Sequence, residues 1–249
     1  MRKIKIREMK LGDGIPKICV PIVATDIKTL EMELEGLKGD FFDFAEWRMD
    51  WFVDILDEKK RKKALNIIRK ALKGKPLLAT FRTEAEGGER DIVLEDYKAL
   101  NCQVIATGEI DLIDIEFMMP SDIIRDIQKV AEEYAVKTVF SSHDFENTPK
   151  EEEIVKKLRR METAGADIAK IAVMPEERED VLVLMQATLS AYEEMRIPII
   201  TMSMGRMGMA SRVVGGEFGS VVTFGSVGRA SAPGQLKAEE LRKALRMMR

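Results

Sequence analysis

Two side chains in this sequence combine a nucleophilic amine with a proton carrier. Lys170 lies inside the apolar run DIAKIAVM, with isoleucine and alanine on both sides. His143, the only histidine of the chain, lies near the end of another apolar run, KTVFSSHDF. A buried ammonium group is unfavourable unless it is paired or used, and a buried lysine loses its proton readily. A neutral lysine beside a histidine can form an imine with a ketone, so we expect the function at this pair.

Both residues also have purely structural interpretations. Lys170 could extend to the surface along its own methylene groups, or a carboxylate such as Asp114 or Glu116 could neutralise it. His143 could be a core histidine whose hydrogen bonds are satisfied, although two serines and an aspartate make its surroundings polar. An imidazole titrates near neutral pH, which suits proton transfer. These residues alone leave both interpretations open.

Polar residues spaced two apart also end several neighbouring apolar runs: Glu46 with Arg48, Thr80 with Arg82, Asp114 with Glu116, and Ser141 with His143. Residues two apart on a strand share one face. In a barrel of parallel strands, the side chains at the C-terminal strand ends converge on one pocket. Any single pair could be an ion pair at a rim, as Glu46 and Arg48 could be. The repetition on successive strands, with Lys170 on the next, favours a polar pocket.

The elements that must position these residues follow a regular rhythm. Apolar, β-branched runs predict eight strands, and charged segments with helical periodicity lie between them. The predicted strands are residues 17–24, 41–50, 76–82, 112–117, 137–145, 167–174, 198–204 and 220–227. The clearest helices are residues 27–37, 59–72, 122–134, 150–161 and 181–195, with caps expected at Asp26, Ser121 and Thr148. Eight alternating strands and helices predict an α/β fold, a (β/α)₈ TIM barrel.

We expect one domain over residues 1–249, because no linker or low-complexity tract divides the chain. Residues 1–14 alternate with period two and predict a short N-terminal β-hairpin outside the barrel, turning at Gly12–Gly14. The basic runs at residues 59–63 and 242–249 are typical of solvated helix faces.

The composition excludes several functions. The 40 basic and 43 acidic residues give a net charge of −3, which argues against a nucleic-acid partner. No apolar run approaches the ~20 residues of a membrane span, and no signal peptide is evident. Two cysteines and one histidine disfavour a disulfide scaffold and a metal site, and fit a cytoplasmic protein. The Gly87–Gly88 pair is too short for a nucleotide-binding fingerprint.

Six motifs resemble type I 3-dehydroquinate dehydratase, in the order of that family along nearly the whole chain. They are EWRMD (46–50), TFRTEAEGGE (80–89), SSHDF (141–145), ADIAKIAVMP (166–175), TMSMGRMGMASR (201–212) and TFGSVGRASAPGQ (223–235). The resemblance implies a class I aldolase-like barrel and a lyase of the shikimate pathway. Its reaction is the syn elimination of water from 3-dehydroquinate to give 3-dehydroshikimate. It further implies a homodimer that uses no metal or other cofactor.

The resemblance also implies roles for individual residues. Lys170 matches the lysine that forms the Schiff base, His143 the proton-transfer residue, and Glu86 the acid that holds this histidine. The substrate-binding positions are matched by Glu46, Arg48, Arg82, Arg212, Ser231 and Gln235. The first three would contact hydroxyl groups and the last three the carboxylate. One departure is Pro21, where some relatives have a serine.

The residues are compatible with this chemistry but leave alternatives. The glycine-rich segment 225–235, called the lid below, could close over a ligand, or it could be an ordinary loop. Arg212 offers a planar fork for a carboxylate, or could pair with Glu217 at a helix end. A different Schiff-base aldolase and a barrel that only binds a metabolite remain as alternative functions.

Overall fold

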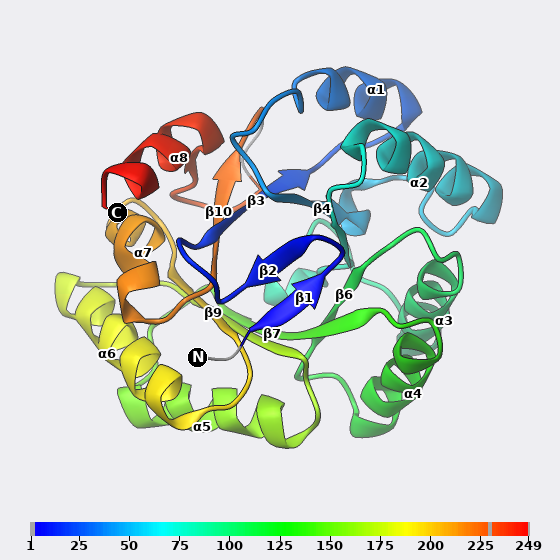
Figure 1. Ribbon diagram of the computed structural model, residues 1–249. Coiled ribbons are helices and arrows are strands. Elements are labelled where there is room, and N and C mark those ends of the chain that lie inside the picture. Colours follow the sequence, from blue (N-terminus) through cyan, green and yellow to red (C-terminus); the bar gives the residue numbers. More distant parts are fainter. Residues whose placement is uncertain (1–2, 229–230, 249) are drawn as a thin grey trace.

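The computed structural model describes residues 3–228 and 231–248. The first two residues of the expected hairpin, residues 229–230 of the lid and Arg249 therefore lie outside the described residues. The predicted barrel is confirmed within the described ranges (Figure 1). A nine-stranded sheet contains the eight barrel strands in sequence order, and a short ninth strand, β11 (Leu236–Lys237), pairs with β10. A parallel bridge from Ile199 to Ser220 closes the ring.

The barrel strands are β3 (Lys17–Ile22), β4 (Phe44–Arg48), β5 (Leu77–Thr80), β6 (Leu112–Glu116), β7 (Lys137–Asp144), β8 (Ile168–Val173), β9 (Ile199–Ser203) and β10 (Val222–Ser226). The helices around them are α1 (Ile27–Glu35), α2 (Glu58–Leu72), α3 (Leu94–Ile105), α4 (Ser121–Glu133), α5 (Glu151–Thr163), α6 (Arg178–Glu194), α7 (Met209–Val214) and α8 (Ala238–Met247). Short 3₁₀ turns lie at η1 (Met49–Trp51), η2 (Glu84–Glu86) and η3 (Gly215–Phe218). None of the described helices has the length and apolarity to cross a membrane.

Only one of the three expected helix caps is present. The Asp26 side chain accepts a hydrogen bond from the backbone N–H of Thr29, and the Thr29 hydroxyl accepts one from the backbone N–H of Asp26, so the two form a capping box. Ser121 is instead the first residue of α4, and α5 begins only at residue 151. The Thr148 hydroxyl donates to the Met174 carbonyl, which ties the loop to the end of β8. The Thr148 prediction was wrong because its hydroxyl satisfies this different backbone group, and the Ser121 prediction was wrong because the N-cap position is taken by Pro120.

The inward side chains change from apolar to polar along β4, β5, β6 and β7, whereas those of β9 stay apolar through Met202. On β6, Leu112 belongs to an apolar cluster inside the barrel, while Asp114 and Glu116 follow it on the same face. On β7, Val139 precedes Ser141 in the same way. The outward residues pack with the helices in the second and larger apolar cluster. The barrel therefore has an apolar floor at the N-terminal strand ends and a polar mouth at the C-terminal ends.

The N-terminal hairpin is present, but its turn was predicted in the wrong place. β1 (Ile4–Ile6) and β2 (Met9–Leu11) are joined through Arg7 and Glu8, not at Gly12–Gly14. Arg7 adopts φ +51°, a conformation usually taken by glycine or asparagine. Because arginine is not a typical residue for such a turn, the sequence around Arg7 gives no turn signal. Figure 1 shows the hairpin lying across one end of the barrel, where Ile6 and Leu11 join the apolar floor.

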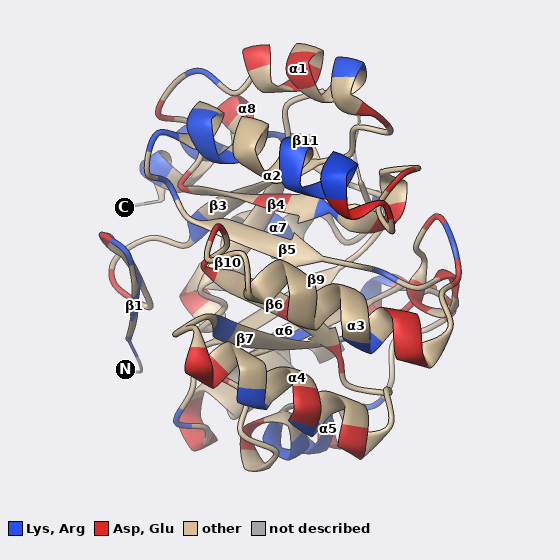
Figure 2. Ribbon diagram, turned by 90° about the vertical axis from the view of Figure 1, so that its right-hand side faces the viewer, with Lys and Arg blue, Asp and Glu red and all other residues tan. Residues whose placement is uncertain are grey.

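The basic runs are only partly solvated. Figure 2 shows lysines and arginines on the outer surfaces of several helices, including α2 and α8. Arg61 of α2 is nevertheless buried and donates to the Ile55 carbonyl and the Gln103 side chain. Arg242 of α8 is buried as well and pairs with Asp43. Hydrogen bonding of the guanidinium to fixed acceptors explains why these two positions depart from the expected exposure.

Candidate active site

A pocket opens at the polar mouth of the barrel, with about 460 Å³ of empty space when its opening to solvent is included. Eight of the nine site residues expected from the sequence line it: Glu46, Arg48, Arg82, Glu86, His143, Lys170, Ser231 and Gln235. They come from β4, β7, β8 and the loops that follow β5 and β10, so the fold brings together residues far apart in the chain.

Lys170 lies in the middle of β8 with 4% of its surface exposed. Its Nζ is 3.4 Å from Asp114 Oδ2 and 3.7 Å from Glu46 Oε1. It also lies 4.8 Å from the centre of the Phe224 ring, whose face attracts a cation. The pairing with Asp114 that the sequence left open is therefore present, whereas Glu116 has other partners. These neighbours favour a positive charge on this nitrogen, whether it is an ammonium or a protonated imine.

Glu86 holds His143 through both its backbone and its ring. One carboxylate oxygen, Oε2, accepts the backbone N–H of His143 at 3.1 Å and lies 2.9 Å from the ring Nδ1. A proton on Nδ1 that is donated to this oxygen leaves Nε2 as the free basic nitrogen. The geometry fixes the ring in an orientation suited to proton transfer.

The electrostatics of this pair favour an uncharged imidazole. Burial, and then the cations Arg82, Lys170 and Arg48, lower the pKa of His143 well below its usual value. Burial raises the pKa of Glu86 to about 8, against the opposing effect of Arg82. The two groups are in contact, so they titrate as a pair. Above the pKa of the pair, Nε2 is unprotonated and can act as a base.

A tight turn brings Glu86 to this position. Gly87 has φ +79°, and a Cβ there would overlap the ring of Phe145, which lies two residues after His143. A Cβ at Gly88 would overlap the carbonyl of Arg82. Glycine is therefore required at residues 87 and 88 for a steric reason, since only a residue without a Cβ lets η2 fold against β7. The pair does not form a nucleotide-binding motif.

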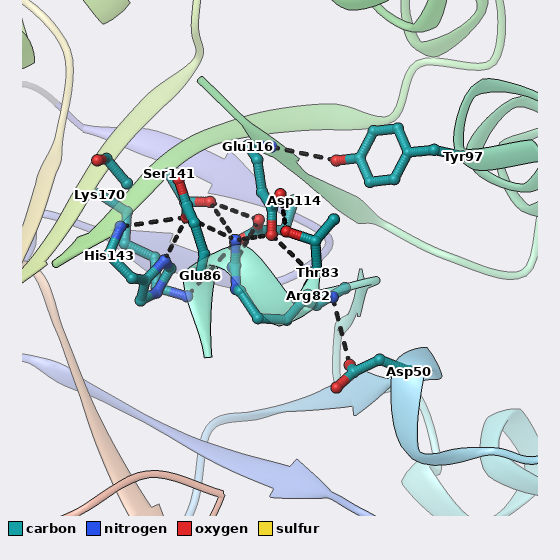
Figure 3. A network of polar contacts seen from close by, with 12 residues as sticks. Asp50, Arg82, Thr83, Glu86, Tyr97, Asp114, Glu116, Ser141, His143 and Lys170 are labelled. Carbon is teal, nitrogen blue, oxygen red and sulfur yellow. Dashed lines mark hydrogen bonds and ion pairs between the residues drawn. The ribbon is translucent and has the colours of Figure 1, made fainter. Parts of the chain in front are cut away.

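Arg82 is the centre of a buried polar network (Figure 3). Its guanidinium donates to Asp114 at 2.8 Å, to Glu116 and Ser141 at 3.0 Å each, and to Glu86 at 3.3 Å. Burial opposes the charge, but the surrounding carboxylates raise the pKa of Arg82. Glu116 also accepts the backbone N–H and the hydroxyl of Thr83 at 2.8 Å each. Arg82 is therefore a fixed cation in the wall of the cavity.

Arg48 does not pair with Glu46, although the sequence allowed that ion pair. It forms a two-pronged contact with Asp50, at 2.9 and 2.7 Å, while Glu46 accepts a hydrogen bond from Thr80 at 3.0 Å. Arg48 also donates to the backbone carbonyl of Ser231 in the lid at 3.4 Å. On β3, the first barrel strand, Pro21 pairs with Glu46 of β4. The site therefore has no hydroxyl group at the position where some relatives have a serine.

Arg212 is the one expected site residue that does not line the cavity. It is 2% exposed, donates to the Pro233 carbonyl in the lid at 3.0 Å and contacts Met202 Sδ. Its Nε has no hydrogen-bond partner in the described part of the chain. Burial lowers the pKa of Arg212 to about 10. In this conformation the lid backbone occupies part of the guanidinium fork.

The methionines around the seventh barrel strand, which the sequence placed in the core and the pocket walls, include the lining residues Met202 and Met204, whereas Ala172 and Phe224 were missed. Ala172 lies two residues after Lys170, and Phe224 lies two residues after Val222 on β10, so the period-two rule could have found them. Among the described residues, no group of three or more His, Cys, Asp and Glu side chains is arranged to hold a metal ion.

The family model described as type I 3-dehydroquinase matches residues 18–249. The chain belongs to the type I 3-dehydroquinase family. The 3-dehydroquinate dehydratase of Syntrophotalea carbinolica is 47% identical over 249 residues, covering 100% of this chain and 98% of that protein. The Listeria innocua 3-dehydroquinate dehydratase matches with the same identity and coverage.

Solved structures of type I 3-dehydroquinases have the same fold. The type I 3-dehydroquinate dehydratase of Clostridium difficile, solved with covalently modified comenic acid, has a TM-score of 0.96 and 43% identity. The match covers 99% of this chain and 98% of that one. The structure from Geobacillus kaustophilus has a TM-score of 0.96 at 38% identity, covering 99% of this chain and 96% of that one. The family membership inferred from the six motifs is confirmed.

Proposed function

We propose that this chain catalyses the dehydration of 3-dehydroquinate to 3-dehydroshikimate through an imine on Lys170. The observation that carries the proposal is a buried amine at the wall of the cavity, together with a histidine whose ring is fixed by a carboxylate. The relatives named 3-dehydroquinate dehydratase match over the full length of the chain, which supports this substrate and a hydro-lyase reaction.

The first stage forms the imine. The ammonium of Lys170 gives up a proton, and the amine attacks the ketone carbon C3 of the substrate. Loss of the ketone oxygen as water leaves a protonated imine, whose nitrogen is the former Nζ. This cation withdraws electrons from C2 and makes its proton removable by a weak base. Asp114 and Glu46, 3.4 and 3.7 Å from Nζ, stabilise the positive charge.

The second stage eliminates water. Nε2 of His143 takes the proton from C2, and the electron pair forms an enamine with the imine carbon. The imidazolium then gives its proton to the hydroxyl leaving from C1, and the imine re-forms in conjugation with the new double bond. Because one group serves as base and then as acid, both events occur on one face, which is a syn elimination. Water then releases the product and regenerates Lys170.

The remaining residues bind and enclose the substrate. Glu46, Arg48 and Arg82 line the cavity, and we assign them to the hydroxyl groups of the substrate. Ser231 and Gln235, whose side chains hydrogen-bond to each other at 3.0 Å, and Arg212 are assigned to the carboxylate. Substrate binding would replace the Pro233 carbonyl at Arg212 with a carboxylate, which is a stronger acceptor.

We further infer a cytoplasmic homodimer that needs no cofactor, metal, nucleic acid or membrane for this reaction. The unpaired state of Cys19 and Cys102 is compatible with a reducing compartment. The carboxylate-binding set disfavours an aldolase for phosphorylated sugars. The Lys170, His143 and Glu86 arrangement disfavours a protein that only binds a metabolite.

The direct test is turnover of 3-dehydroquinate, followed through the ultraviolet absorbance of the conjugated enone product. We expect product with the wild-type chain and none above background with Lys170→Ala. An inactive but folded wild-type protein would contradict the proposed function.

A further inference from the structure

Asp114 is the carboxylate nearest to the Lys170 nitrogen, yet it does not line the cavity. It lies on β6 with no exposed surface, within the polar network around Arg82 (Figure 3). Its two oxygens have different partners. Oδ1 accepts hydrogen bonds from Arg82 at 2.8 Å and from Ser141 at 2.6 Å, and Oδ2 lies 3.4 Å from Lys170 Nζ. The family resemblance assigns no role to this residue, and the sequence alone offered it only as a carboxylate that could neutralise Lys170.

The local contacts hold this carboxylate ionised and in place. Although burial alone would raise the pKa of Asp114, the charges of Arg82 and Lys170 and the hydroxyl of Ser141 keep it below the usual value. The Arg82 contact is short, and Arg82 is itself fixed by Glu116 at 3.0 Å. Oδ2 therefore presents a permanent negative charge to the lysine nitrogen, on the side away from the cavity.

Glu46, the second carboxylate near Lys170, differs from Asp114 in its exposure to the cavity. It lies 3.7 Å from Nζ, but it also lines the cavity, where a ligand can compete for it. Because Asp114 does not line the cavity, a ligand bound there does not compete for this carboxylate directly. An unpaired buried cation is strongly unfavourable, so the Lys170 nitrogen needs a partner that persists while the ligand is bound.

We propose that Asp114 is a positioning residue that acts as the permanent counter-ion of the Lys170 nitrogen, first for the ammonium and then for the protonated imine. The inference rests on the proposed imine chemistry. By favouring the cationic imine, Asp114 keeps the electron sink protonated while His143 removes the substrate proton. It also orients Nζ, which Oδ2 and the Phe224 ring hold from two directions.

Other charged or titratable groups lie around Lys170 and must be kept constant in a test. Glu46 on β4 is 3.7 Å from Nζ, Cys19 on β3 and His143 on β7 feel the charge of Lys170, and Arg82 after β5 shares Asp114 with it. Glu116 is the matched control, because it accepts a hydrogen bond from Arg82 at 3.0 Å and is buried like Asp114. Its described partners do not include Lys170, so Glu116→Gln loosens Arg82 without removing the proposed counter-ion.

The experiment compares the wild type, Asp114→Asn and Glu116→Gln in the pH dependence of kcat for 3-dehydroquinate. In Asp114→Asn we expect kcat to fall about tenfold or more, as for loss of an electrostatic stabiliser of the transition state, with KM within about threefold. The alkaline limb of kcat should move to lower pH by about one unit or more, because the imine loses its proton more easily without the anion. In Glu116→Gln the limb should stay at the wild-type pH, whatever the size of kcat.

The other possible outcomes of this experiment also test whether Asp114 is the counter-ion of Lys170. An unmoved limb in Asp114→Asn, or an equal shift in Glu116→Gln, would overturn the proposal. If Asp114→Asn does not fold, Asp114→Ala, which leaves room for water, is expected to give the same shift. Failure of both to fold, while Glu116→Gln folds, would assign Asp114 to barrel stability and overturn the role as a counter-ion. Wild-type turnover measured in parallel tests the proposed function separately.

Discussion

At the scale of single residues, the site consists of cations and carboxylates that fix one another before any ligand binds. Glu86 Oε2 accepts from the His143 backbone at 3.1 Å and from Arg82 at 3.3 Å, and lies 2.9 Å from the imidazole Nδ1. These contacts set the orientation of the ring and the charge of its surroundings. The basic nitrogen is thus prepared by a neighbour that does not itself have to touch the reacting atoms.

The Glu86–His143 pair predicts a shift in the acid limb of kcat/KM. In the wild type, this limb reports protonation of the pair, with a midpoint up to about 8, the raised pKa of Glu86. In Glu86→Gln only the imidazole titrates, and without the carboxylate nothing offsets the burial and the cations that lower the pKa of His143. The limb should therefore move to a pH below the usual imidazole value of 6.5.

The control for this prediction is Glu84→Gln, an exposed glutamate in the same turn, which should leave the profile unchanged. A Glu86→Gln limb at the wild-type pH, or one displaced to higher pH, would show that another group controls the base.

Residue types and spacing predicted most of the site but not its pairing. The period-two rule placed Glu46, Arg48 and Lys170 on the inside of the barrel, as the structure has them. It could not show that Arg48 pairs with Asp50, because this contact depends on η1 turning back after β4. It also could not show that Arg212 lies behind the cavity wall, because that position depends on where the lid packs.

At the scale of elements, the described part of the lid is anchored to two arginines of the site. Arg48 donates to the Ser231 carbonyl at 3.4 Å and Arg212 to the Pro233 carbonyl at 3.0 Å. Gly205, in the loop after β9, donates its backbone N–H to the same Pro233 carbonyl at 3.3 Å. Lid position and the side chains assigned to the substrate are therefore mechanically linked.

Gly234 is the tightest point of this contact, which predicts a strong effect of Gly234→Ala. The residue has φ +75°, and a Cβ there would overlap the carbonyl oxygen of Gly205. The lid should then sit further from the cavity, and kcat/KM should fall on the order of tenfold to 100-fold, since small misplacements of substrate-positioning groups are costly.

Gly228→Ala is the matched control, because the Cβ at this lid position meets no atom of the described residues within 4 Å. It should produce a clearly smaller loss of kcat/KM in the same steady-state assay. Equal losses in the two variants would mean that the Gly234 contact does not set the lid position.

The strands and helices were predictable because the barrel repeats one pattern, a buried β-branched run followed by an amphipathic helix. The turn of the hairpin was not, because Arg7 and Glu8 form a two-residue turn without a glycine or asparagine. The cap predicted at Thr148 failed because its hydroxyl donates to the Met174 carbonyl, a tertiary acceptor that only the folded chain supplies.

At the scale of the whole molecule, the barrel separates stability from chemistry along its axis. The apolar floor contains Leu11 of the hairpin, which is fully buried beside Phe44 and Cys19. The polar mouth carries the residues assigned to the reaction. The floor contributes packing, and changes at Leu11 should not reach the cavity.

Leu11→Ala tests this separation. Removing a fully buried leucine side chain should lower the free energy of unfolding by about 2–5 kcal/mol, measured by denaturant titration, because a cavity remains in the floor. The kcat/KM should be unchanged at temperatures where the variant is folded. Lys10→Ala, an exposed neighbour on β2, should change neither quantity, and loss of activity in folded Leu11→Ala would refute the separation.

The central claim is the covalent bond between Lys170 and the substrate ketone, and borohydride trapping tests it most directly. Incubation with 3-dehydroquinate and borohydride should add the mass of the reduced ligand to the peptide that carries Lys170. The same adduct should form in His143→Ala, which can make the imine but has lost the base for turnover, and should be absent in Lys170→Ala. Turnover by the wild type without any adduct on Lys170, or with the adduct on another residue, would contradict the account.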